Sequence, residues 1–499
     1  MPMRSSGALA GSVAAALSLC GACSAASPAE SARAEASSPV TPQDFLRRGE
    51  ALSSDAGPAI RRALASGRPV RFPAGLYVVR PDPASRMSDG HLAWSVRVPS
   101  GARLAFDVGA TIKAAPGLRS WTRVVSFQGA TNIKVTGELR VDASVDQIAS
   151  DNNEHMHGIF LFNTTHSSFE RLTSVNARGD NIYIGGTDNS RGTHNVSIGS
   201  IRAARAGRKN LVLQASADLR IGDAELDNRE GGARLWGGRG DDTDGHSLDV
   251  EPDSFTGKVP NDARIGRLLT LGSGNDFTAG ISATASQAWV LSIGNFDART
   301  IPRAGVAAWV QYGISIKADR IHVSGLTGVD AQSVLFYAGR LDVGELEFGG
   351  RRAGDYLLLL ANVAGNRPRL NAARVKMTNP VGGGLEIRNA EAEIGQFTAS
   401  TRQNAIWNRG LPAEPGVRSE LKVREIALEN SGDPGGSSSA ILITGDAGTI
   451  VTRIDRIRQS DTRQVGIRHL IRAAGGAATT LSIGSADLVA GTALLATAR

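Results

Sequence analysis

The chain contains many short runs in which apolar and polar residues alternate. In each run an Ile, Leu or Val recurs at every second position, and examples are residues 158–161, 181–184, 210–213 and 247–250. A period of two is typical of a β-strand with one buried face. Gly, Asn, Asp and Ser separate the runs, which predicts turns between the strands. We therefore expect an all-β fold.

An Ile-Gly or Val-Gly dipeptide repeats along the chain. Its intervals fit one or more units of about 22 to 30 residues, which is the signature of a repeat architecture. A unit of this length with two short strands predicts a right-handed single-stranded parallel β-helix, in which each coil lies on the previous one. The copies are Ile198-Gly199, Ile221-Gly222, Ile265-Gly266, Ile293-Gly294, Val343-Gly344, Ile394-Gly395 and Ile483-Gly484. Such a solenoid needs a cap over its first coil, and residues 42–66, where Pro42 starts a helical stretch, predict one.

Composition and charge narrow the picture. The 499 residues include 59 Gly and only 5% aromatic residues, which agrees with many turns and thin packing layers, and 41% hydrophobic residues exclude a disordered chain. The net charge is +7, but the Lys and Arg residues are scattered without a run of five, so we expect no nucleic-acid partner. The excess of positive charge fits a polyanionic partner such as an acidic polysaccharide, or a solvated Arg-rich surface.

The N-terminal residues predict export. Residues 1–26 have a positive start at Arg4 and a short apolar stretch, which is typical of a secretory signal and too short to cross a bilayer. The segment ending at Cys23 resembles a lipobox, so a lipid anchor on Cys23 and a plain cleavage after Ala25 are alternatives. We expect a periplasmic, secreted or lipid-anchored protein with a flexible linker over 27–41 and a β-helix domain over 42–499. Both cysteines lie in the signal, so no disulfide framework is expected.

The segments after the predicted cap resemble the pectate-lyase superfamily. Residues 55–60 and 67–77 look like the capping helix, strand and proline-glycine turn with which that superfamily begins its β-helix, and residues 98–101, 109–112 and 132–137 look like its next coils. The resemblance implies a parallel β-helix. It leaves the activity open, because the superfamily holds lyases, hydrolases, epimerases, phage tailspikes and non-catalytic proteins.

Alignment of the coils predicts where chemistry gathers. We take Ile159, Ile182, Leu211, Leu248 and Phe277 as equivalent inward residues, and successive coils lie about 4.8 Å apart. The same register aligns Val334, Leu357 and Leu385 in later coils, where the neighbouring residues are less polar. The polar residues within two positions of them then form one edge. The candidates for substrate binding are His157, Asn181, Tyr183, Asn210, Asn275 and Asp276, together with Trp236 in the Gly-rich insertion that follows.

One strand carries a pair of carboxylates. Asp249 and Glu251 point outward from the same strand about 6.6 Å apart, at twice the rise of a strand residue. At that distance they can act as acid and base of an inverting glycoside hydrolase. With Asp253 they could instead bind calcium, and a solvated strand without a site is the third alternative.

Two adjacent cations, Arg208 and Lys209, favour cleavage of a polysaccharide by β-elimination. Arg208 or Lys209 could take the C5 proton of a uronate, with His246 or His157 assisting and Asp180 in the preceding turn. The turn Gly179-Asp180-Asn181 resembles the Gly-Asp-Asp turn of polygalacturonases, with Asn in place of the second Asp. We expect an exported enzyme that cleaves an acidic polysaccharide by β-elimination. The hydrolase that uses Asp249 and Glu251, and a non-catalytic glycan-binding or envelope protein, are the alternatives.

Overall fold

The computed structural model describes residues 38–499 with gaps, so the predicted signal, the Cys23 anchor and residues 27–37 of the predicted linker lie outside the described residues. The segments within 38–499 that are not described are 88–91, 117–121, 145–154, 187–191, 232–245, 251–260, 273–276, 281–288, 301–308, 313, 329–333, 337–338, 353–355, 363–366, 411–417, 430–439, 446–448, 461–468, 475–477, 489–492 and 498–499. Some strand residues are described by their backbone only, and His246 is one of them.

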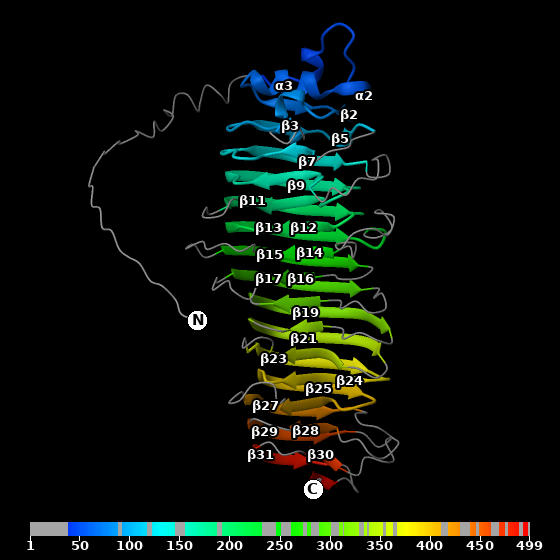
Figure 1. Ribbon diagram of the computed structural model, residues 1–499, viewed down its shortest axis with the longest axis vertical. Helices are drawn as coiled ribbons and strands as arrows, with labels where there is room; N and C mark the ends of the chain where they lie inside the picture. The colour runs from blue at the N-terminus through cyan, green and yellow to red at the C-terminus, as the bar shows by residue number, and fades with distance from the viewer. Residues whose placement is uncertain are drawn as a thin grey trace, which may run out of the picture. The chain divides into compact units, whose positions relative to one another are not determined.

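The unit from Pro39 onward is a stack of coils, and each central coil contributes one strand to each of two parallel sheets (Figure 1). The long-strand sheet consists of β1 (Val70–Phe72), β2 (Gly75–Val79), β4 (Arg103–Phe106), β5 (Ala110–Ala114), β7 (Lys134–Asp142), β9 (Thr165–Val175), β11 (Thr193–Ala204), β13 (Ser216–Asp227), β15 (Asn261–Gly272), β17 (Trp289–Thr300), β19 (Ser315–Gly328), β21 (Arg340–Arg352), β23 (Arg369–Asn379), β25 (Glu391–Thr401), β27 (Arg418–Leu428), β29 (Thr449–Gln459) and β31 (Ala478–Asp487).

The short-strand sheet consists of β3 (Trp94–Arg97), β6 (Arg123–Ser126), β8 (Ile159–Phe162), β10 (Ile182–Gly185), β12 (Lys209–Leu213), β14 (His246–Val250), β16 (Phe277–Gly280), β18 (Trp309–Tyr312), β20 (Val334–Phe336), β22 (Tyr356–Ala361), β24 (Gly383–Arg388), β26 (Ile406–Gly410), β28 (Ile441–Gly445), β30 (His469–Ala474) and β32 (Ala493–Thr497). The paired strands of both sheets run parallel, for example β10 with β8 and β11 with β13. The predicted parallel β-helix is confirmed.

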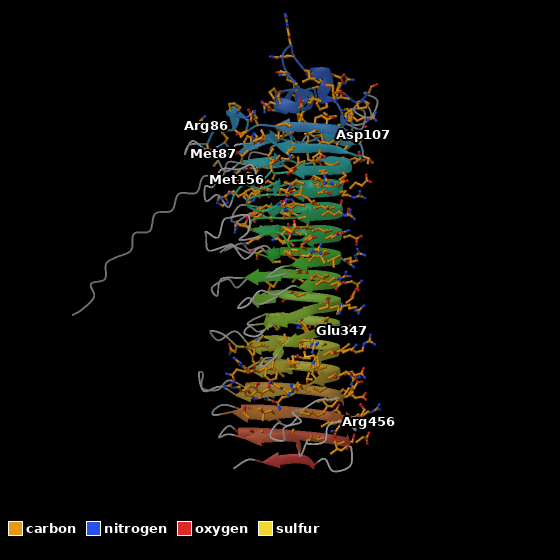
Figure 2. The ribbon with its side chains drawn as sticks, turned by 90° about the vertical axis from the view of Figure 1, so that its right-hand side faces the viewer. Arg86, Met87, Asp107, Met156, Glu347 and Arg456 are labelled. Carbon is orange, nitrogen blue, oxygen red and sulfur yellow. The ribbon has the colours of Figure 1, made fainter. Side chains whose placement is uncertain are left out.

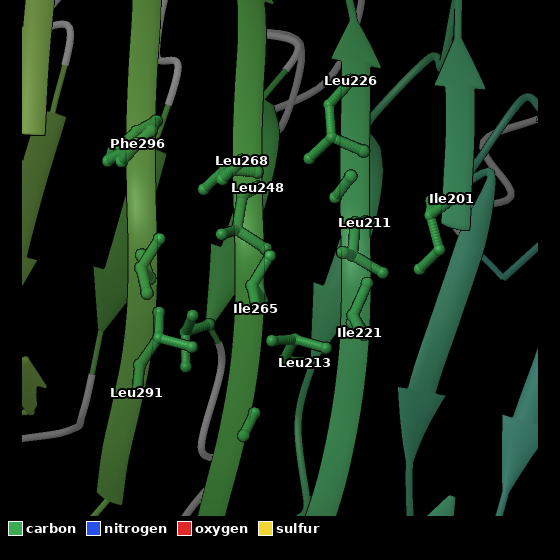
Figure 3. Close-up of a cluster of buried hydrophobic side chains, with 14 of the residues drawn as sticks. Ile201, Leu211, Leu213, Ile221, Leu226, Leu248, Ile265, Leu268, Leu291 and Phe296 are labelled. Atoms are coloured by element: carbon green, nitrogen blue, oxygen red, sulfur yellow. The ribbon is translucent and has the colours of Figure 1, made fainter. Parts of the chain in front are cut away.

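The predicted coil register is confirmed over five coils. Ile159 pairs with Ile182, Ile182 with Leu211, Leu211 with Leu248, and Leu248 with Phe277. Figure 3 shows Leu211 and Leu248 in one buried cluster with side chains of the long-strand sheet, so both sheets supply the core. Further along the stack, the register based on Leu357 is wrong by one residue, because Leu358 is the residue that pairs with Val334 and Leu385.

Helices cap the first coils, as predicted. The turn η1 (Pro42–Phe45) is followed by the helices α2 (Leu52–Asp55) and α3 (Gly57–Ala65) at the N-terminal end of the stack (Figure 1). Ala59, Ile60, Ala63 and Leu64 form the buried face of α3 at helical spacing. Ile60, Ala63 and Leu64 belong to the same core cluster as the coils. The cap thus covers apolar side chains that the first coil would otherwise expose.

The repeated glycines stack in a ladder along the long-strand sheet. A Cβ built on Gly222 would lie 2.3 Å from the carbonyl oxygen of Gly199, and one on Gly266 would lie 2.6 Å from that of Gly222. The regular pairing between these strands skips each of these glycines, which indicates a corner in the strand at this point. The Ile-Gly repeat therefore marks a corner where the preceding coil lies too close for a side chain to fit.

Replacing Gly222 by Ala is expected to lower the free energy of unfolding by about 1–3 kcal/mol, because the new methyl group forces adjacent coils apart. Denaturant unfolding at neutral pH measures the change. Gly349→Ala is the matched control, since a Cβ there would meet no atom within 4 Å. Equal stability of the two variants would contradict the close contact at the corner.

Charged side chains cover the outer face of the long-strand sheet. Figure 2 shows Glu347 and Arg456 projecting from it, and neighbouring coils exchange exposed ion pairs such as Lys376 Nζ to Glu347 Oε1 at 2.9 Å. Exposed pairs of this kind contribute little to stability. The charges of this face are exposed to solvent, whereas several charges of the short-strand sheet are buried.

Candidate functional site

Two stacked turns place the candidate residues. The turns that connect β9 to β10 and β11 to β12 begin at Asn176 and Arg205, which both adopt the left-handed conformation, with φ of 62° and 57°. Arg205 Nη1 donates to Asn176 Oδ1 at 3.0 Å, and the backbone N–H of Gly207 donates to the carbonyl oxygen of Ala177 at 2.8 Å. Since successive turns follow the same path, they bring the residues just before β10 and at the start of β12 together.

Asn181 and Asn210 have a structural role. Asn181 Nδ2 donates to Asn210 Oδ1 at 2.7 Å, while Asn181 Oδ1 accepts from the backbone N–H of Ala177 at 3.2 Å. Both asparagines are completely buried. The chain turns at this position and directs both side chains inward, so the structure gives Asn181 and Asn210 contacts within the protein, while their predicted contacts with substrate stay a prediction.

Five charged or titratable side chains form a buried group, which we call the charged cluster: His157, Asp180, Arg208, Lys209 and Asp249. None of them is more than 7% exposed. Asp180 Oδ2 lies 3.2 Å from His157 Nδ1 and 3.9 Å from Arg208 Nη1, and Lys209 Nζ forms an ion pair with Asp249 Oδ2. The structure thus brings together His157, Asp180, Lys209 and Asp249, as the sequence predicted, but buries them beneath the surface.

Aromatic rings and a further cation border the charged cluster. The His157 ring stacks on Phe160, with centroids 5.4 Å apart, and on Tyr183 at 5.0 Å, and Arg123 lies 4.6 Å above the Phe160 ring. Tyr183 and Arg123 are half-buried and form the accessible side of this region. Sequence reasoning missed Arg123, although Val125 pairs with Ile159, so extending the predicted register back by one coil would have placed Arg123 beside His157.

Burial and charge set the protonation of the cluster. Burial lowers the pKa of His157 to about 4, so its ring is neutral at pH 7. Burial by itself would raise the pKa of Asp180, but the Arg208 guanidinium and His157 outweigh it and hold that pKa below its ordinary value. Burial raises the pKa of Asp249 despite the Lys209 ammonium. The two carboxyl groups therefore have different proton affinities, which is typical of a site that carries out chemistry.

The neutral His157 is expected to make the protein less stable as the pH falls from about 6.5 to about 4. Within this window the unfolded chain binds a proton on His157 that the folded chain does not, so up to about 3 kcal/mol of stability is lost. Asp249, whose raised pKa makes stability fall as the pH rises, acts in the opposite direction. Unfolding of the wild type and His157→Gln at pH 7 and pH 5 isolates the histidine: the difference between the two proteins should shrink at pH 5.

Several predicted site residues lie outside the part of the chain that the structure describes. The backbone of His246 pairs with Lys209 in the predicted register, but its side chain lies outside the described residues, as do Trp236, Glu251, Asp253, Asn275 and Asp276. The hydrolase pair of Asp249 and Glu251 therefore stays a prediction. So does calcium: among the described side chains no group of three or more His, Cys, Asp or Glu could hold a metal ion, but two of the three predicted ligands are not among them.

Comparison with known proteins adds little. No family model matches the chain, and no curated protein does. Among solved structures, the chain is similar to the crystal structure of the pre-mature bacteriophage phi29 gene product 12, with 12% identity and a TM-score of 0.42, over 90% of this chain and 68% of that chain. The fold assignment rests on the strand pairing, and membership of the pectate-lyase superfamily stays a prediction. In the part of the chain that the structure describes, no helix has the length and apolarity needed to cross a membrane.

Proposed function

We propose that the protein is an exported enzyme that cleaves an acidic polysaccharide by β-elimination at the charged cluster. The observation that carries the proposal is the composition of this region: among the residues that the structure describes, three cations, Arg123, Arg208 and Lys209, lie beside two carboxylates, Asp180 and Asp249. Burying charges is costly, and such groups are commonly retained for function. A cation excess beside an aromatic wall suits a uronate, which has a carboxylate and an apolar sugar face.

The contacts suggest a role for each group. Lys209 forms an ion pair with Asp249 and Arg208 lies near Asp180, so the two carboxylates hold both cations in position to neutralise the substrate carboxylate. His157 is neutral, and its Nδ1 lies near the Asp180 carboxylate. The backbone N–H of Asp180 also points at Nδ1, at 3.4 Å. We assign the Nδ1 proton to the shorter contact with the charged carboxylate, which leaves the lone pair of Nε2 free to accept a proton. His157 thus replaces Arg208 or Lys209 as the proposed base.

The reaction follows from these roles. His157 Nε2 takes the proton from C5 of the uronate, and the electron pair of that bond forms the C4–C5 double bond. The C4–O4 bond breaks, and the leaving oxygen takes up a proton from water. The cations stabilise the enolate-like charge that builds up on the substrate carboxylate. Hydrolysis is supported less, because Asp249 is already engaged by Lys209.

Incubation with polygalacturonate and with alginate is expected to produce an unsaturated sugar that absorbs in the near ultraviolet, in step with new reducing ends. Neutral dextran is the control and should yield neither. New reducing ends without the absorbance would instead indicate a hydrolase that uses Asp249 and Glu251. No turnover on any of a broad panel of acidic polysaccharides would favour the non-catalytic, glycan-binding alternative.

A further inference from the structure

The short-strand sheet carries a second buried charge, far along the stack from the charged cluster. Glu386 in β24 has a side chain only 3% exposed and lies between the core residues Leu385 and Ile387. Arg388 Nη2 donates to Glu386 Oε2 at 2.8 Å, Arg388 Nε donates to Oε1, and Arg409 Nη1 lies 3.7 Å from the same Oε1. A buried carboxylate thus holds two arginines in place.

Among the side chains that the structure describes here, the two arginines leave a surplus of positive charge at the surface. Arg388 and Arg409 are register partners on adjacent strands, so their side chains start side by side. Like charges directly opposite each other in a sheet repel, and here one carboxylate offsets two cations. The arginine side chains are 26% and 32% exposed, whereas Glu386 is buried. A second anion bound from the solvent would reduce the repulsion and use the planar donor geometry of the guanidinium groups.

Trp407 completes this group of residues. The Arg409 guanidinium lies 4.7 Å above the Trp407 ring, and Trp407 Nε1 donates to Thr444 Oγ1 at 2.8 Å, so both the ring and the cation are fixed. The Tyr356 ring packs against the Trp407 ring, with the two ring centroids 5.7 Å apart. Since Trp407 is half-buried, an apolar ring edge is accessible next to two cations. A ligand with both a carboxylate and C–H surface fits this combination.

We propose that Arg388 and Arg409, held by Glu386 beside Trp407, form a subsite that binds a carboxylate of an acidic saccharide. The identity of the ligand as part of the polysaccharide substrate rests on the proposed function. The subsite faces the same way as the charged cluster, because Asp249 and Glu386 occupy one register position of the short-strand sheet. Five strand steps of about 4.8 Å separate them, about 24 Å in total. A long chain that runs along the stack reaches both, and a short oligosaccharide reaches one.

The test compares long with short saccharides, and the wild-type protein with a variant that lacks the positive charge of Arg409. Binding of polygalacturonate and of oligogalacturonates shorter than about 24 Å is measured by calorimetry on the wild-type protein and Arg409→Gln. This variant keeps the Arg388–Glu386 pair, so Glu386 is not left without a cation. We expect the wild type to bind the polymer at least about tenfold more tightly than the short chains, and Arg409→Gln to lose that advantage. Cleavage of short chains should not change.

The matched control is Arg374→Gln, which removes an equally charged but exposed side chain from the outer face of the long-strand sheet. Loss of polymer affinity in Arg409→Gln but not in Arg374→Gln supports the subsite. Equal affinity in both variants overturns it, while formation of unsaturated product by the wild type would still support the proposed function. If Arg409→Gln does not fold, the wild-type protein alone provides the test. An affinity of the wild type that is the same for the polymer and for short chains overturns the subsite. Failure of the wild type to bind any uronate overturns both proposals.

Discussion

Lys209→Met is expected to lower the free energy of unfolding by about 3–5 kcal/mol, because it leaves Asp249 buried without the cation that balances it. Both side chains of the pair are almost inaccessible to water, so no solvent replaces the lost contact. Part of the loss should be recovered at low pH, where Asp249, whose pKa burial already raises, takes up a proton. Denaturant unfolding at pH 7 and pH 4 measures both effects.

Two further variants test the physical reason for this prediction. Lys376→Met removes another ion pair between a lysine and a carboxylate, that with Glu347, but on the exposed outer face of the long-strand sheet, and should cost less than about 1 kcal/mol. The double variant Lys209→Met, Asp249→Leu removes both buried charges and should recover most of the stability. If Lys209→Met and Lys376→Met were equally stable, burial would not make the Lys209–Asp249 pair more important for stability than an exposed pair, and the prediction would be wrong.

His157→Gln is expected to lower the rate of elimination by about 10² to 10⁴-fold, which is the usual contribution of a general base. The amide keeps a polar group of similar size next to Asp180 but cannot accept the C5 proton. We expect kcat to fall with little change in KM, because the cations Arg208 and Lys209 that bind the carboxylate remain. Absorbance of the unsaturated product on polygalacturonate or alginate measures the rate.

His166→Asn is the control for this experiment. His166 is an exposed histidine on β9 with a φ of 50°, a conformation that Asn also tolerates. Its replacement should leave the rate unchanged. Full activity in a folded His157→Gln variant would exclude His157 as the base and return attention to Lys209. An equal loss in both variants would indicate a general effect on the fold.

The β-helix and its register could be predicted because side chains alternate with a period of two and every coil repeats the previous one. Ile182, Leu211 and Leu248 align in the structure as they do in the sequence pattern. The same alignment misplaced Leu357, where the apolar run from Leu357 to Leu360 has no alternation to indicate the register.

The candidate site was predictable only in part. The pattern placed His157, Asp180 and Lys209 at one edge, since register is a property of the backbone. It could not show that Asn181 and Asn210 turn inward, because this depends on a bend in the chain just before β10 and β12. It also missed Glu386, although a single acid between two core residues, with Arg388 two positions later, was a readable signal.

By itself, the sequence determined which residues share a coil position, because alternation and repeat length are enough to set the stacking. Only the tertiary structure decided which of those residues are buried and which charges meet. The ion pair of Lys209 with Asp249 and the two arginines around Glu386 depend on side-chain directions at corners and on neighbouring coils, and a pattern along the chain does not contain these. The chemistry of the site therefore follows from burial and pairing, while its place in the fold follows from the repeat.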